Sequence, residues 1–190
     1  MAGTTTWDNR LAQLLSIFFH PAHSFLYVII LAGEISLELF CEAYLLPIVS
    51  IYAALKYLGN FRWNYLTHSQ RQLTYFIQLL WQFFALSRIV NSPATIFSLW
   101  ASCLTLTMLI AVGFWKKPSL HIAGNIILLG AIWQFELLNC WQTTLPVLIL
   151  VAVAWARLRV NAHTHLELIE GTAIGVMAFL LVVVLFFERF

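Results

Sequence analysis

Long apolar segments follow one another along almost the whole chain, with only short polar loops between them. A helix that spans a bilayer needs about 20 mostly apolar residues. Seven segments approach that length: Ser24–Phe40, Ala43–Gly59, Gln72–Val90, Ala94–Trp115, Ser119–Leu138, Thr143–Ala156 and Leu166–Phe187. Only 9% of the 190 residues are charged, against roughly 25% in a soluble domain. The pattern therefore predicts an all-α, polytopic transmembrane helical bundle.

We predict about seven spans. The number is six or seven because Thr143–Ala156 is short for a span. We predict a single membrane domain over residues 1–190, in which residues 24–187 form the bundle and residues 1–23 an interfacial segment. Within that segment, Leu11–Phe19 is predicted as an interfacial helix, ended by His20-Pro21 because proline disfavours helix at the residue before it. No basic stretch precedes the first apolar run, so no cleaved signal peptide is expected.

The basic residues are distributed unequally between the two faces of this bundle. One face receives eight of them and the other two: Arg10, Lys56, Arg62, Arg71, Lys116, Lys117, Arg157 and Arg159 against Arg88 and Arg189. Positive charge in short loops marks the cytoplasmic side. The sequence therefore predicts an integral, multi-pass protein of an inner or plasma membrane, with a cytoplasmic N-terminus. A net charge of +2 without a basic patch does not indicate a nucleic-acid partner.

Three polar segments lie on the predicted cytoplasmic face: residues 62–72, 116–121 and 157–170. Their arginines suit a phosphate site, since guanidinium groups clamp phosphate oxygens. His121 and His163 could act as acid and nucleophile. Glu167 follows His163 by four residues, which places both on one helical face. The alternative interpretation is a solvated start of a cytoplasmic helix.

The same segments carry a family pattern in three pieces. The first piece is a motif of Ser-Arg, five residues, His, three residues and Asp. This chain has Ala156-Arg157, His163 and Glu167 at the same spacings. Pro118-Ser119-Leu120-His121 matches three residues of Pro-Ser-Gly-His. The third piece is a motif of Lys, six residues and Arg-Pro. This chain has Asn64, six residues and Arg71-Gln72, so it keeps only the arginine. On these residues the sequence resembles a divergent integral-membrane branch of the type 2 phosphatidate phosphatase and haloperoxidase superfamily.

The resemblance implies a metal-independent phosphatase that passes through a phosphohistidine. It implies His163 as the nucleophile, Glu167 as its orienting carboxylate and His121 as the acid for the leaving group. Arg71, Arg157 and Ser119 would bind phosphate, and Lys117 could replace the missing lysine. We therefore expect an integral membrane phosphatase-like protein that acts on a lipid phosphate or an isoprenoid diphosphate, with no cofactor and no metal.

Departures from the motifs keep a second hypothesis open. Asn64 removes a cation, Leu120 replaces the glycine that lets backbone approach phosphate, and Ala156 removes a hydroxyl. Such a chain could be a pseudoenzyme: a non-catalytic subunit of a larger membrane complex that keeps the bundle for packing, lipid or pigment binding. Its partners would be membrane lipids and other chains, or copies of itself in a homo-oligomer. For the GxxxG step at Gly171 and Gly175, packing inside the bundle is favoured over a dimer contact.

Overall fold

The structure is a computed structural model of the 190-residue chain, and it describes residues 7–20, 27, 30–31, 41, 45–57, 66–88, 93–139 and 144–187. Every regular element within these residues is a helix, as the sequence predicts. The helices are α1 (Trp7–Phe18), α4 (Leu46–Tyr57), α5 (His68–Arg88), α6 (Pro93–Gly113), α7 (Leu120–Gln134), α8 (Thr144–Arg159) and α9 (His165–Phe187).

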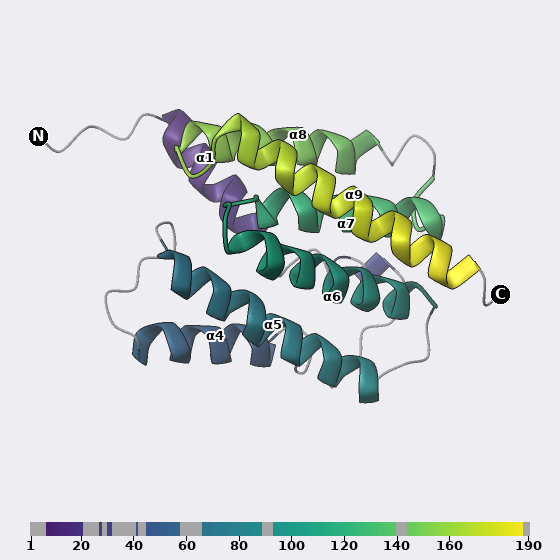
Figure 1. Cartoon of the computed structure of the whole chain (residues 1–190). Coiled ribbons are helices and arrows are strands. Elements are labelled where there is room, and N and C mark those ends of the chain that lie inside the picture. The colour runs from purple at the N-terminus through teal and green to yellow at the C-terminus, as the bar shows by residue number, and fades with distance from the viewer. Residues whose placement is uncertain are drawn as a thin grey trace, which may run out of the picture.

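The helices lie side by side in an elongated bundle (Figure 1). α5 packs mainly against α6, α7 against α9, and α1 against α8, while α6 also contacts both α7 and α9. α4 covers α5 on one side of the bundle. Because α5 and α9 run in one general direction and α6 and α8 in the other, the starts of α5 and α9 lie toward the end of the bundle where α1 begins (Figure 1).

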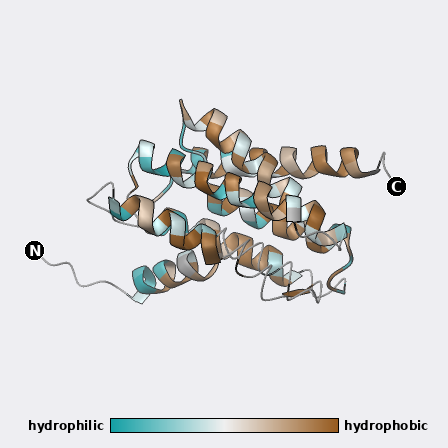
Figure 2. Ribbon diagram, turned by 90° about the horizontal axis from the view of Figure 1, so that it is seen from below, coloured by the Kyte–Doolittle hydropathy of each residue, from teal (hydrophilic) through white to brown (hydrophobic). Residues whose placement is uncertain are grey.

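Six of the seven predicted spans correspond to the helices α4 to α9, and the first, Ser24–Phe40, lies almost entirely outside the described residues. Within the described part of the chain, two helices, Pro93–Gly113 and His165–Phe186, are long and apolar enough to cross a membrane, and Leu46–Tyr57 and Leu120–Gln134 are apolar but shorter. In Figure 2 the helix that runs to the C-terminus is mostly brown toward that end, the colour of hydrophobic residues. Length and composition of these two helices thus suit a membrane protein.

An aromatic cluster holds one end of the bundle together. Phe97, at the start of α6, is buried, and its ring lies 5.3 Å from that of Phe135, 5.8 Å from that of Phe179 and 5.7 Å from that of Phe186. These rings come from α6, the end of α7 and the second half of α9, and edge-to-face pairs of this kind add to the stabilisation from burial. The cluster fixes three helices at the end opposite the starts of α5, α7 and α9.

Capping boxes determine where α5 and α9 begin. The hydroxyl of Thr67 accepts a hydrogen bond from the Gln70 amide at 3.3 Å, and the Gln70 side chain accepts one from the Thr67 amide at 2.9 Å. Thr164 and Glu167 repeat the arrangement before α9, at 3.3 and 2.9 Å. Each box satisfies amide groups that have no partner inside the helix. As a result α5 starts at His68, four residues before the predicted span.

Candidate functional site

A cavity of about 780 Å³ opens among the ends of several helices, and it collects most of the residues that the sequence predicts for a phosphate site. Five of the predicted residues line it: Arg71, Lys117, His121, Arg157 and His163. They come from the first turn of α5, the α6–α7 connection, the start of α7, the last turn of α8 and the α8–α9 connection. Alternating helix direction therefore brings together residues that are up to 92 positions apart, from 71 to 163.

Close packing of α9 on α7 joins two of these segments. A Cβ atom added at Gly171 would lie 2.5 Å from the backbone oxygen of Ser119, and one at Gly175 would lie 2.9 Å from that of Ala123. Only glycine allows the two backbones to approach this closely. The Ser119 amide also donates a 3.0 Å hydrogen bond to the carbonyl of Glu167. The GxxxG step thus packs inside the bundle, as favoured from the sequence, and it aligns the start of α7 with that of α9.

The connection between α8 and α9 holds His163 in a defined place. α8 ends in a Schellman motif, in which the amides of Asn161 and Ala162 donate to the carbonyls of Leu158 at 3.0 Å and Arg157 at 3.1 Å. Asn161 has a φ of 53°, the left-handed conformation that this motif requires and that asparagine adopts more readily than most residues. His163 follows between this helix end and the capping box of α9, so both sides of the connection are anchored.

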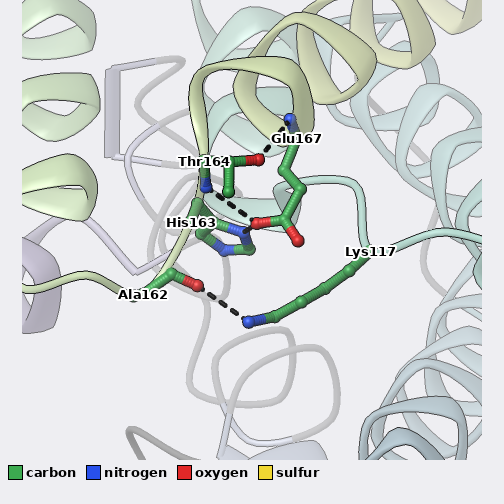
Figure 3. Close-up of polar contacts among 5 residues, drawn as sticks. All are labelled: Lys117, Ala162, His163, Thr164 and Glu167. Carbon is green, nitrogen blue, oxygen red and sulfur yellow. Dashed lines mark hydrogen bonds and ion pairs between the residues drawn. The ribbon is translucent and has the colours of Figure 1, made fainter.

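His163 and Glu167 form the pair expected from their spacing (Figure 3). Nδ1 of His163 lies 3.1 Å from Oε2 of Glu167, and the imidazole is 8% exposed. Burial, followed by the nearby Arg157 guanidinium, lowers the pKa of His163 to about 4, although Glu167 opposes the shift. The ring is therefore neutral at pH 7. Because a carboxylate only accepts, Nδ1 carries the proton, and the unprotonated Nε2 is the nitrogen available to the cavity.

The cations around the cavity have few anionic partners. Nη1 of Arg71 and Nε of Arg157 are buried, and neither has a hydrogen-bond partner among the described residues. Lys117 donates a 2.8 Å hydrogen bond to the carbonyl of Ala162 (Figure 3). Burial lowers the pKa of Lys117, as do Arg71 and Arg157, while Glu167 acts in the opposite direction. Positive charge is thus concentrated at one wall of the cavity, where an anion would satisfy it.

His121 is hydrogen-bonded to the N-terminal helix α1. Its Nε2 lies 3.3 Å from the carbonyl oxygen of Ser16, near the end of α1, and its ring contacts that of His20 edge-to-face at 5.0 Å. Since a carbonyl only accepts, Nε2 carries a proton in this arrangement. Asn125, one turn further along α7, donates to the carbonyls of His121 at 2.7 Å and Phe19 at 3.3 Å. The end of α1 therefore forms part of the site.

Two predicted site residues do not line the cavity. Ser119 is fully buried at the α7–α9 contact, and its hydroxyl has no hydrogen-bond partner among the described residues. Glu167 stands behind His163 and reaches the cavity only through that ring. The structure thus brings five of the seven predicted residues to the cavity wall, together with one supporting carboxylate. Asn64 lies outside the described residues.

Several residues of the site were not expected from the sequence. Ser16 and His20 line the cavity although they belong to the segment predicted to lie along the membrane interface. Asn161 also lines it and closes α8. The capping role of Glu167 could have been recognised from Thr164-His165-Leu166-Glu167, because Thr-x-x-Glu before an apolar run is typical of a helix start. Among the residues described, no three His, Cys, Asp or Glu side chains are grouped as metal ligands would be.

No protein-family model, curated protein or solved structure matches the chain.

Proposed function

We propose that the chain is an integral membrane protein of about seven spans, with the starts of α5, α7 and α9 on the cytoplasmic side. The split of the basic residues supports this orientation, since Arg71, Lys116, Lys117 and Arg157 all belong to one end of the bundle. Large apolar side chains exposed along the helices, such as Leu80, Leu148 and Leu180, support a lipid environment.

We propose further that this protein is a phosphatase-like enzyme of the type 2 phosphatidate phosphatase superfamily, acting on a lipid phosphate or an isoprenoid diphosphate. The single observation that carries the proposal is a neutral, carboxylate-oriented histidine beside two half-buried arginines, each with a buried nitrogen that has no hydrogen-bond partner among the described residues. This arrangement combines a free nitrogen nucleophile with preorganised positive charge, which phosphoryl transfer requires.

The proposed reaction has two steps. Nε2 of His163 attacks phosphorus, the bond from phosphorus to the substrate oxygen breaks, and that oxygen leaves with a proton from His121. This step requires an imidazolium at His121, with a second proton on Nδ1, because the Nε2 proton is directed to the carbonyl of Ser16. Water then attacks the phosphohistidine and gives a proton to His121, the N–P bond breaks, and inorganic phosphate leaves. Arg71 and Arg157 would stabilise charge on the phosphoryl oxygens in both steps. Glu167 would stabilise the positive charge that develops on the ring of His163.

One observation favours a second candidate, a non-catalytic membrane subunit that binds an anionic lipid. The Nε2 proton of His121 is directed to the carbonyl of Ser16, so a neutral His121 ring has no proton for a leaving group. Leu120 and Ala156 also depart from the phosphatase motifs. In this alternative the same cations would hold a headgroup without turnover, and the bundle would pack within a larger assembly.

Phosphate release from purified, detergent-solubilised protein tests the proposal, with a diacylglycerol phosphate, a sphingoid phosphate and an isoprenoid diphosphate as substrates. We expect release by the wild type, none by His163→Ala, and wild-type rates for His165→Ala. His165 is the matched control because it is exposed and does not line the cavity. Acid-labile phosphate bound to the wild type and absent from His163→Ala would identify the intermediate. If no substrate is hydrolysed while a lipid phosphate still binds, the second candidate replaces the first.

A further inference from the structure

The cavity continues from the cationic wall along one face of α5. Arg71, Tyr75, Gln78 and Gln82 all line it, and their spacing places them on the same side of the helix over three turns. At 1.5 Å per residue, Gln78 lies about 10 Å and Gln82 about 16 Å along the axis from Arg71. If the phosphate of a ligand binds at Arg71, the chain of that ligand would therefore extend past Gln78 and Gln82.

α6 forms the facing wall of this deep part. The contact of Gly113 with the side chain of Gln72 pairs the end of α6 with the start of α5, and the two helices run in opposite directions. Ser102 is 11 residues before Gly113, and Gln82 is ten residues after Gln72, so the two side chains reach about the same depth. Both line the cavity. The deep end is therefore bordered by neutral polar groups from two helices.

The hydrogen bonds of these groups differ from those of their neighbours. Thr74 and Thr105, which also line the cavity, donate to carbonyls of their own helices at 2.9 and 2.7 Å. Gln82 is only 4% exposed, and its Oε1 has no hydrogen-bond partner among the described residues. A buried carbonyl oxygen without a partner costs roughly 1–3 kcal/mol, and in a membrane bundle the surrounding lipid offers no replacement.

A ligand with a plain hydrocarbon chain would leave Oε1 of Gln82 without a hydrogen-bond partner. An unbranched alkyl or isoprenoid chain has no group that could donate to Gln82 or accept from it. A hydroxyl or a secondary amide can do both, and it would also suit the hydroxyl of Ser102. The side chains of Gln82 and Ser102 are thus matched by a ligand chain that carries a polar group at that depth.

We propose that Gln82 and Ser102 form a subsite for a hydroxyl or amide group on the ligand's chain, about 10–16 Å from its phosphate. This subsite rests on the proposed function only in placing the phosphate at Arg71 and Arg157. It selects among amphiphilic phosphates: a phosphate on a chain hydroxylated or amidated near its middle is preferred over one on a plain hydrocarbon chain.

The test compares the affinities of hexadecyl phosphate and its mid-chain hydroxylated counterpart for full-length protein that carries His163→Ala, so that neither probe is consumed. We expect the hydroxylated probe to bind about two- to tenfold more tightly, the effect of one net hydrogen bond. Gln82→Leu should remove this preference and leave the affinity for hexadecyl phosphate unchanged. Gln134→Leu, the same substitution outside the cavity, should keep the preference.

Thermal unfolding without ligand separates binding from packing. Because Gln82→Leu removes a buried oxygen without a partner among the described residues, the variant should melt at or above the wild-type temperature, whereas a glutamine needed for packing would give a lower melting temperature. Equal affinities for the two probes, or equal loss of preference in Gln82→Leu and Gln134→Leu, would overturn the subsite and leave the proposed phosphatase intact. A preference that depends on Gln82, in a wild type that releases no phosphate, supports the subsite and refutes the enzyme.

Discussion

The carboxylate of Glu167 has two roles that one substitution can separate. It accepts a hydrogen bond from the Thr164 amide at 2.9 Å as part of a helix cap, and one from Nδ1 of His163 at 3.1 Å. Glu167→Gln keeps an oxygen for the cap, because glutamine also serves in capping boxes. The negative charge beside the imidazole is lost. Stability should therefore change little, while any step that places positive charge on His163 should slow.

The expected magnitude follows from the hydrogen bond that changes. A hydrogen bond to a charged group contributes about 1.5–3 kcal/mol and a neutral one about 0.5–1.5 kcal/mol, so the loss is about 1–2 kcal/mol, or roughly five- to thirtyfold in rate. Loss of one preorganised electrostatic group can reach about 10²–10³. We therefore expect phosphate release by Glu167→Gln to fall between about five- and a thousandfold, measured as initial rates on a lipid phosphate at pH 7.

Thr164→Ala is the matched variant, because it removes the hydroxyl that caps the Glu167 amide and leaves His163 untouched. Loss of such a cap costs about 1 kcal/mol, or about 2–4 °C in melting temperature for a chain of this size. Turnover should stay within twofold of the wild type. If Glu167→Gln instead lowers the melting temperature as Thr164→Ala does and keeps wild-type turnover, Glu167 acts only as a cap.

Three further predictions concern the cavity and its walls. Arg71→Met should weaken binding of a lipid phosphate about ten- to hundredfold without lowering the melting temperature, since it removes a half-buried guanidinium whose buried Nη1 has no partner among the described residues. Arg159→Met, outside the cavity, should leave binding unchanged, and isothermal titration measures both. Asn161→Ala should lower stability by about 1 kcal/mol in thermal melts and Asn161→Gly should not, because only the alanine is strained at positive φ. Histidine NMR should find His163 neutral down to about pH 4. The depressed pKa contributes stability that is complete above about pH 6.5 and is lost as the pH falls toward 4. A His163 resonance that titrates near 6.5 would contradict the burial and the neighbouring charge assigned to the ring.

The helices could be predicted from the sequence because long apolar runs separated by short polar loops are typical of helices in a membrane bundle. α8 illustrates the limit of this approach: its apolar run ends at Ala156, yet the helix continues to Arg159, since the Schellman motif at Asn161 determines the end. Hydropathy does not register hydrogen bonds of this kind. The same reason explains why α5 and α9 begin at capping boxes that the hydropathy pattern does not mark.

The cavity could be predicted only in part, because some of its residues are close together in the sequence and others are far apart. Arg157, His163 and Glu167 lie within one connection, so local spacing brings them together. Ser16 and His20 reach the cavity because α1 packs against α8, and no spacing within α1 indicates that contact. Gln82 was not recognised because a polar residue in an apolar segment has no pattern of its own. Its meaning depends on the facing helix.

Hydrogen bonding is distributed unevenly between the backbone of the site and its side chains. The connection at Ala162 and His163 is held by a Schellman motif, a capping box and the Lys117 ammonium, so its backbone is fully determined. In contrast, Arg71 and Arg157, which line the same cavity, keep buried nitrogens without partners among the described residues. A loop built only for stability would direct these donors to its own carbonyls, since each unpaired polar group costs free energy. A satisfied backbone beside two guanidinium groups that each keep an unpaired nitrogen among the described residues is what a preorganised anion site requires. This contrast supports a bound phosphate more strongly than any single motif residue does.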